Sequence, residues 1–288
     1  MTFNPLAASN SIESFFLLDG KNKLALDIGA QTPSISADFI KHLINKYKHL
    51  NKNQIANLNL LKEKIINKKK FTTQEYFLSL GFKNYNSIDI NGAYKSYKFD
   101  LNKDIVSVYK FNKKYDLVIN NGTGEHIFNQ YALFLNMHNL TKKNGLLLHI
   151  LPFIDWVNHG FYNFNPIVFA DLAASNDYEI VKLSFANRNA TEIIIESKSY
   201  NLVFEQIKPW QDPTFIKKAI NFTKEKVGDN IILVVMLRKK NNNKFKIPLQ
   251  GKYLADFKES HASSSDYSGQ KIGSGMAKNQ LNDNLKRK

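Results

Sequence analysis

The sequence predicts an α/β fold with a mostly parallel central sheet and helices on both faces. Short apolar runs typical of buried strands alternate along the chain with segments whose apolar residues recur at helical spacing. Such alternation is typical of parallel strands joined by crossover helices. Polar residues collect directly after the strand segments, and parallel sheets bind ligands at the carboxyl ends of their strands. We therefore expect the functional site at the edge where those strands end.

The first part of the chain is expected to contain one buried strand followed by three helices. The third helix has Thr72 or Thr73 as its N-terminal cap and Gly81 as its stop, because short hydroxyl side chains satisfy the first free amides and glycine tolerates the terminal turn. The elements expected here are a strand at 24–28 and helices around 39–47, 55–65 and 73–80.

The remaining chain continues the alternation. The turn signal Asn120-Asn121-Gly122 ends one strand, and the basic residues and glycine of 142–145 close a helix. From about His261 onward large apolar side chains are almost absent, which predicts a flexible tail. The further elements expected are strands at 85–89, 96–101, 115–119, 146–151, 180–185, 192–196, 202–205 and 231–237, and helices over 125–140 and 213–226.

Composition excludes several classes of protein. With 43% hydrophobic and 12% aromatic residues, the chain has enough apolar material for a folded core. It contains no cysteine, so disulfide scaffolds, zinc–cysteine sites and thiol nucleophiles are ruled out. The first ten residues carry no basic segment, and the apolar run 15–18 is too short for a signal peptide or a membrane span. We therefore expect a cytoplasmic protein.

The formal net charge of +15 makes nucleic acid a candidate partner. However, arginine, which reads phosphate and guanine best, occurs only at Arg188, Arg238 and Arg287, while lysine and asparagine are abundant throughout. The charge therefore indicates a compositional bias of the whole sequence, and a nucleic-acid partner is not favoured.

Three acids follow three successive strand segments. Asp27 precedes Gly29 at the end of the first, Asp89 ends the next, and Asp100 ends the third. An acid after the second strand of such a sheet can bind the hydroxyls of a ribose. Each acid could instead cap a neighbouring helix, but three at equivalent positions favour a nucleoside site.

The later segments carry a resemblance to a known family. The strand 115–119 runs into Asn120-Asn121-Gly122-Thr123-Gly124-Glu125-His126, and the similarity continues through 143–149 and 159–166. This ordered string resembles a branch of the class I S-adenosylmethionine-dependent methyltransferases that is marked by a Gly-Thr-x-Glu-His segment after the fourth strand. The resemblance covers about 24–179, interrupted between 34 and 70. It implies a Rossmann-like fold, a bound S-adenosyl-L-methionine and methyl transfer.

The resemblance also implies roles for single residues. Asp27 and Gly29 would belong to the first cofactor motif, and Asp89 would accept hydrogen bonds from both ribose hydroxyls. The family's second glycine is replaced here by Gln31, a position we still assign to the cofactor, although a side chain there limits the approach of the backbone. The other implied contacts are Asp100 and Leu101 at the adenine, and Asn120 and Gly122 near the sulfonium.

The family resemblance and the composition divide the chain into three parts. We expect an N-terminal extension at 1–22, a methyltransferase domain at 23–258 with a helical insertion at about 34–70, and a flexible basic tail at 259–288. The insertion accounts for the 62 positions between the first two acids (89 minus 27), against about 20 in a compact dinucleotide-binding fold.

Histidines are the candidate bases. His126, His159 and His149 fall in segments expected to border the open end of the sheet, and imidazole titrates near neutral pH. Each could equally be a structural histidine of a loop. Glu125 and His126 with a second histidine could also form a divalent metal site, but adjacent residues seldom converge on one ion, so we expect no metal. The aromatic stretch 161–164 either forms an acceptor pocket or packs its loop onto the core.

The predicted function is methyl transfer from S-adenosyl-L-methionine to an oxygen or nitrogen of a small-molecule or glycan acceptor. The alternatives are an RNA methyltransferase, which the basic charge permits, and a nucleoside-binding module without catalysis, which the altered first motif permits. The sequence identifies neither the acceptor nor the oligomeric state.

Overall fold

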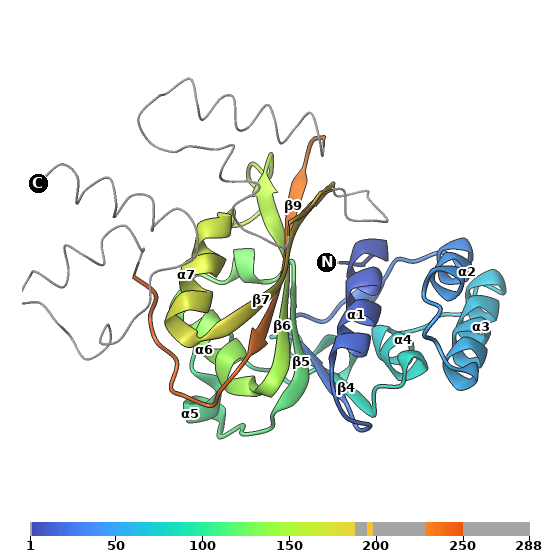
Figure 1. Ribbon diagram of the computed structural model, residues 1–288, viewed down its shortest axis with the longest axis horizontal. Coiled ribbons are helices and arrows are strands. Elements are labelled where there is room, and N and C mark those ends of the chain that lie inside the picture. The colour runs from blue at the N-terminus through green and yellow to red at the C-terminus, as the bar shows by residue number, and fades with distance from the viewer. Residues whose placement is uncertain (1, 188–194, 198–227, 250–288) are drawn as a thin grey trace, which may run out of the picture.

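The computed structural model describes residues 2–187, 195–197 and 228–249. Its centre is a seven-stranded sheet in the order β4-β2-β5-β6-β9-β7-β8, seen nearly edge-on in Figure 1. The strands are β2 (Leu24–Asp27), β4 (Asn84–Ser87), β5 (Tyr115–Asn121), β6 (Thr141–Ile154), β7 (Tyr178–Asn187), β8 (Ile195–Ser197) and β9 (Ile231–Lys239).

Most of the sheet is parallel. β4, β2, β5 and β6 pair in parallel, whereas β9 runs antiparallel to both β6 and β7, and β8 runs antiparallel to β7. The carboxyl ends of β4, β2, β5 and β6 therefore meet at one edge. The predicted α/β, Rossmann-like fold with a mostly parallel sheet is confirmed.

Helices cover both faces of the sheet (Figure 1). Because side chains alternate along a strand, Leu117 and Ile119 pack into the core under α1 to α4, while Val118 packs into the core under α5 to α7. The helices of the first face are α1 (Pro5–Leu17), α2 (Ala37–Lys46), α3 (Lys52–Ile66) and α4 (Thr73–Leu80); those of the second are α5 (Ile105–Tyr109), α6 (Gln130–Leu140) and α7 (Pro166–Asn176).

The ends of α4 follow from its own sequence. The Thr72 side chain accepts from the Glu75 amide, and the Glu75 carboxylate accepts from the Thr72 amide, which satisfies two free donors at once. Gly81 closes the helix at a φ of 101°, in the left-handed region that favours glycine. The predicted cap and stop are confirmed.

The N-terminal residues form a helix that the sequence analysis did not anticipate. Asn4 caps α1 and Pro5 occupies its first turn. Leu6 and Ile12 are completely buried in the same cluster as Leu117 of the central strand, so α1 contributes to the main core. Before it, the short strand β1 (Thr2–Phe3) pairs in parallel with β3 (Thr32–Pro33), which follows the glycine turn of β2.

The predicted strand at 96–101 is wrong, because only Tyr97 bridges to the sheet, opposite Ile88. Beyond that bridge the Phe99 amide donates to the carbonyl of Tyr97 within its own segment, so the ladder stops. The rings of Tyr97, Phe99 and Tyr109 stack on one another instead. Aromatic packing at the edge of the sheet therefore replaces further strand pairing.

The helix expected over 125–140 begins later, at Gln130, where the Asn129 side chain caps the first turn. The residues before it, Gly124–His126, form a short 3-10 turn, η2. At the other end β6 starts directly at Thr141, so the basic segment that was expected to close the helix belongs to the strand.

Other predicted elements agree with the structure within a few residues, including the helices α2 and α3 of the expected insertion and the strands β2, β4, β5, β6, β7 and β9. The strand expected at 192–196 overlaps β8. The strand at 202–205, the helix at 213–226 and the tail at 259–288 lie outside the described residues. No helix among the described residues combines the length and the apolar character needed to cross a bilayer.

Candidate active site at the strand ends

Asp27 ends β2 with its carboxyl group completely buried. One oxygen, Oδ2, accepts from the Tyr85 hydroxyl at 3.3 Å, and Oδ1 has no hydrogen-bond partner within the described residues. Burial raises the pKa of this carboxyl well above its usual range, and the Tyr85 hydroxyl offsets the rise only in part. Asp27 therefore lies at the end of β2, in a buried environment that favours the neutral form of its carboxyl group.

The glycine turn after β2 is closed by the loop that follows β5. A Cβ atom on Gly29 would lie 2.0 Å from Oγ1 of Thr123, so only glycine fits beneath that side chain. Beside it, the buried Gln31 donates from Nε2 to the backbone carbonyl of Asn121 at 3.0 Å. Gln31 thus ties the two loops together at the position where the resembling family has a glycine.

Asp89 joins the end of β4 to this turn. Its Oδ2 accepts from the Ala30 amide at 3.2 Å, and its Oδ1 accepts from the Asn91 amide at 3.1 Å. Asp89 is half-buried and close enough to Asp27 for its charge to favour the neutral form of that acid. The acid expected to bind a ribose therefore lies beside the glycine turn expected to belong to the same site.

Asp100 and Leu101 occupy a separate turn nearer α6. The Asp100 carboxylate accepts from the backbone and side-chain amides of Asn102, which hold the pKa of this acid below its usual value. Leu101 is buried in the cluster that contains Ile28 and Ile88, the residues that directly follow β2 and β4. The structure thus connects Leu101 to these strand ends, whereas no described hydrogen bond links Asp100 to Asp27 or Asp89.

The end of β5 is built around Asn120. Its Oδ1 accepts from the Gly124 amide at 2.8 Å, which fixes the turn that contains Gly122, and Gly122 has a φ of 63°. Its Nδ2 lies 3.4 Å from Nδ1 of His149. Asn120 therefore sets the path of the chain toward Glu125 and His126.

His149 differs from the other two candidate bases. It is completely buried between Phe134 and Phe169, and burial lowers its pKa to about 3. A neutral, inaccessible imidazole cannot contact an acceptor, so the geometry argues against its expected role as a base. It lies next to Asn120, behind the turn.

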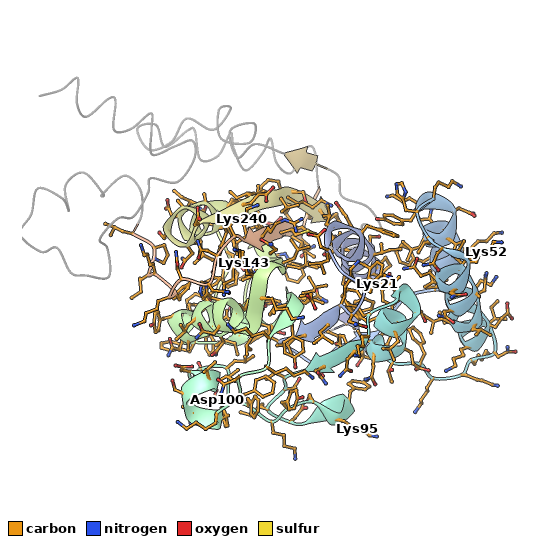
Figure 2. The ribbon with its side chains drawn as sticks, turned by 60° about the horizontal axis from the view of Figure 1, so that its bottom comes forward. Lys21, Lys52, Lys95, Asp100, Lys143 and Lys240 are labelled. Carbon is orange, nitrogen blue, oxygen red and sulfur yellow. The ribbon has the colours of Figure 1, made fainter. Side chains whose placement is uncertain are left out.

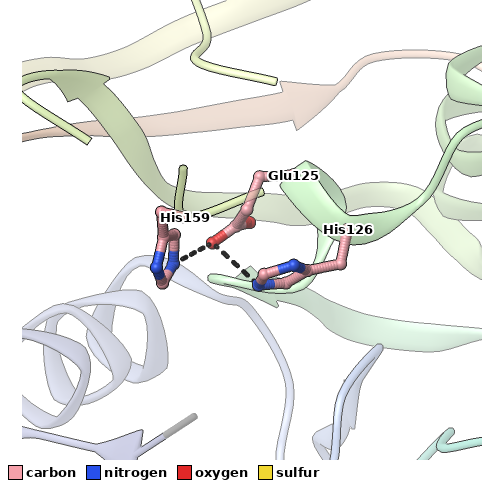
Figure 3. Close-up of side chains that lie close together, drawn as sticks. All are labelled: Glu125, His126 and His159. Atoms are coloured by element: carbon pink, nitrogen blue, oxygen red, sulfur yellow. Dashed lines mark ion pairs between the residues drawn. The ribbon is translucent and has the colours of Figure 1, made fainter. Parts of the chain in front are cut away.

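Glu125, His126 and His159 form one cluster beyond that turn, shown in Figure 3. Oε1 of Glu125 lies 3.5 Å from Nε2 of His159 and 3.9 Å from Nε2 of His126. The carboxylate side chain is 1% exposed, whereas the two imidazoles are 35% and 44% exposed. The structure therefore brings two of the predicted bases together around an acid.

Burial raises the pKa of Glu125 to about 7. The pKa of His126 is lowered, mainly by partial burial and also by the neighbouring His159. The carboxyl group of Glu125 therefore keeps its proton to a higher pH than an ordinary glutamate does, next to two partly exposed imidazoles, an arrangement that suits proton transfer.

The loop after β6 holds His159 in this position. The amides of Phe161 and Tyr162 both donate to the backbone carbonyl of Glu125, at 2.8 Å and 3.3 Å. A Cβ on Gly160 would lie 2.9 Å from that same carbonyl oxygen, so the loop approaches as closely as glycine permits. The ring of Trp156 packs against His159 with a centroid separation of 4.8 Å.

Exposed aromatic rings border the cluster. Phe128 and Phe161 are 70% and 66% exposed and contact each other edge to face at 5.8 Å, while the Tyr162 hydroxyl donates to the Phe128 carbonyl. Phe164 of the stretch 161–164 is buried, as expected for a loop packed onto the core, whereas Phe161 remains at the surface and the acceptor pocket stays a prediction.

A cavity of about 480 Å³ lies on the other side of the glycine turn, next to β4. Gln31 is the one predicted site residue that lines it, and Tyr85, at the same wall, is the residue that contacts Asp27. Sequence reasoning missed Tyr85 and Thr123. Thr123 belongs to the Gly-Thr-x-Glu-His segment at 122–126, but no sequence pattern indicated its contact with Gly29.

The lysines labelled in Figure 2, Lys21, Lys52, Lys95, Lys143 and Lys240, come from separate parts of the chain and are spread across the view. This distribution agrees with a compositional origin of the positive charge and gives no support to a nucleic-acid partner.

No protein-family model matches the sequence, and no curated protein matches it either. Among solved structures, the chain is similar to the O-methyltransferase of a trans-AT PKS multienzyme of Brevibacillus brevis in complex with S-adenosyl-L-homocysteine (14% identity, 83% of this chain and 73% of that chain, TM-score 0.36).

It is also similar to the N-methyltransferase NodS from Bradyrhizobium japonicum WM9 in complex with S-adenosyl-L-homocysteine (12% identity, 83% and 89%, TM-score 0.40) and to TehB from Haemophilus influenzae (10% identity, 81% and 62%, TM-score 0.43). The likeness is one of fold.

Proposed function

We propose that this chain is an S-adenosylmethionine-dependent methyltransferase. The observation that carries the proposal is the hydrogen bond from the Ala30 amide to Asp89, because it places the acid after β4 against the glycine turn after β2. A nucleoside at the carboxyl ends of these neighbouring parallel strands would meet both elements.

The residues at the end of β4 fit the cofactor better than those at the glycine turn after β2. Asp89 is half-buried and retains acceptor capacity beyond its two backbone amides. The cavity beside β4 is lined by Gln31 but not by Asp89, Leu101 or Gly29. Near Gly29, by contrast, Thr123 and Gln31 already occupy the space above the turn. Asp89 and Leu101 would therefore hold the nucleoside, and Asn120 and Gly122 would line the remainder.

The acceptor would lie against Glu125, His126 and His159. When bound, the cofactor supplies an electrophilic methyl group; the acceptor oxygen or nitrogen forms a bond to its carbon, the sulfur–carbon bond breaks, and the acceptor proton leaves to the protein. His126 and His159 are the exposed groups able to activate the acceptor, with Glu125 behind them to stabilise positive charge. Phe128 and Phe161 offer an apolar surface to a small-molecule or glycan acceptor.

Calorimetric titration with S-adenosyl-L-homocysteine tests the cofactor assignment. Asp89→Asn keeps the size of the side chain and one acceptor oxygen but removes the charge, so we expect binding to weaken at least about 100-fold, a difference of about 2.7 kcal/mol. Asp19→Asn, at an exposed acid in the turn after α1, should bind like the wild type. Equal affinities of all three proteins would contradict the proposal.

The closure above Gly29 favours one alternative, a module of this fold that does not catalyse methyl transfer. In that case the wild-type protein would show no heat of binding with S-adenosyl-L-homocysteine, although its circular dichroism and unfolding transition were those of a folded protein.

A further inference from the structure

The geometry of the Glu125, His126 and His159 cluster is close to that of a three-ligand metal site. One oxygen and two imidazole nitrogens, one from each residue, all lie within 4.8 Å of one another. Two donors bound to one ion at about 2.1 Å each lie about 3.0 to 4.2 Å apart, depending on the angle between them. The two separations from Oε1 of Glu125, 3.5 Å and 3.9 Å, already fall inside that range.

An ionised Glu125 would be stabilised by a positive charge beside it. Glu125 is 1% exposed, its Oε2 accepts no hydrogen bond within the described residues, and no lysine or arginine of those residues pairs with it. A buried carboxylate is costly unless a positive charge compensates it. A cation held between Oε1 and the two imidazoles would supply this charge at the entrance of the site.

The three donors are held in place before any ligand arrives. The carbonyl of Glu125 receives two amides of the loop that carries His159, and Gly160 permits the close contact between that loop and Glu125. The short η2 turn directs the neighbouring Glu125 and His126 side chains toward the same point, as Figure 3 shows. Because of this turn, the two adjacent side chains can converge on one ion, which adjacent residues seldom do.

We propose that Glu125, His126 and His159 bind a divalent transition-metal ion. Two imidazoles and one carboxylate suit Zn²⁺, Fe²⁺, Co²⁺ or Ni²⁺, whereas Mg²⁺ and Ca²⁺ prefer ligand sets of oxygen alone. Both imidazoles are partly exposed, so the ion keeps open positions toward solvent. Binding of the ion does not depend on the proposed methyl transfer.

If both proposals hold, the ion specifies how the acceptor is activated. An acceptor hydroxyl bound at an open position loses its proton more readily, because the metal stabilises the oxyanion. The imidazoles then act as ligands and not as the base. An acceptor with an oxygen able to reach the ion is therefore the substrate class that this site favours.

Titration of chelator-treated, tag-free full chain with Co²⁺ tests the metal site directly. The visible absorption bands of protein-bound Co²⁺ should saturate at one ion per chain. Glu125→Gln, His126→Gln and His159→Gln should each weaken the affinity at least about 100-fold, because loss of even an outer-shell partner costs 10- to 100-fold. His49→Gln, at an exposed histidine elsewhere, should bind Co²⁺ like the wild type.

Two measurements keep the outcome unambiguous. Thermal unfolding without metal establishes that each variant is folded, and His126→Gln changes an exposed side chain that the core does not need. Absence of saturable Co²⁺ binding by the wild type, or equal binding by the folded ligand variants and His49→Gln, would overturn the proposal. S-adenosyl-L-homocysteine titration of the same samples separates the two assignments, since either ligand can bind without the other.

Discussion

Two buried acids, Asp27 after β2 and Glu125 after β5, lie at neighbouring strand ends in contrasting surroundings. Each has one carboxylate oxygen without a hydrogen-bond partner in the described structure. Asp27 faces the hydroxyl of Tyr85, itself buried, whereas Glu125 faces two imidazoles that remain partly exposed. The acids are equally buried, but Glu125 lies 3.5 Å and 3.9 Å from two partly exposed imidazoles, whereas the hydrogen-bond partner of Asp27 is itself buried.

The comparison shows that burial of an acid does not by itself make a reactive site. The Asp27 carboxyl is completely buried, and Thr123 and Gln31 close the glycine turn that follows it. The loop that follows β6 is bonded to the backbone of Glu125, and the imidazoles of His126 and His159 remain partly exposed. The accessibility of the neighbouring groups therefore separates the structural acid from the candidate reactive one.

The largest effect should come from Gly29→Ala, which tests the closure above β2. The added methyl group would collide with Oγ1 of Thr123, and we expect the free energy of unfolding to fall by about 3 kcal/mol, the upper end of the usual cost of overpacking. Chemical denaturation measures this change. Removing the hydroxyl in Gly29→Ala, Thr123→Ala should restore most of the loss; equal stability of both variants would show that the contact is loose.

A smaller effect on stability is expected from His149, the neutral imidazole behind the loop that follows β5. The pKa of His149 is lowered to about 3 by burial, so the unfolded chain binds its proton first and the stability falls as pH drops below about 6.5. Between pH 6.5 and 5 this amounts to about 2 kcal/mol. His149→Gln should lose less stability than the wild type over that interval, as followed by denaturation at each pH. His138, whose pKa is lowered to about 4, remains in both proteins.

Asp27→Asn tests the closed turn after β2. Here the stability of the wild type falls as pH rises, which is opposite to the effect of His149. Because the pKa of Asp27 is raised in the folded protein, the wild type loses stability as pH rises above the ordinary value of the group, and the asparagine variant does not. The stability difference in favour of the variant should grow by up to about 1.4 kcal/mol per pH unit, measured between about pH 4.5 and 5.5. A constant difference would mean that Asp27 is ionised in the fold.

Gln31→Ala should have the smallest effect on stability. It removes the hydrogen bond from Nε2 to the Asn121 carbonyl, which is worth about 1 kcal/mol. The same change clears space above the glycine turn, so S-adenosyl-L-homocysteine should bind more tightly to the variant than to the wild type in calorimetric titration. Weaker binding to a folded variant would show that Gln31 is a cofactor contact and not an obstruction.

Local chemistry determined much of the fold in advance. Helix α4 begins and ends where its capping residues indicate, and the apolar runs of β2, β5 and β6 lie in the centre of the sheet. The segment at 96–101 was mispredicted because its aromatic residues satisfy the strand pattern equally well when they stack on one another. Helix α1 was missed because its amphipathic pattern is weak, with small buried residues such as Ala7 and Ala8.

The sequence by itself determined the strand ends on which the candidate residues lie, because hydrophobic periodicity and turn residues act over a few positions. Only the tertiary structure decided which of those residues meet. His159 reaches Glu125 because backbone amides of the β6 loop bond to the carbonyl of that residue, and His149 leaves the candidate site because β6 directs it into the core. Contacts between distant segments depend on how the strands pack, which no local pattern records.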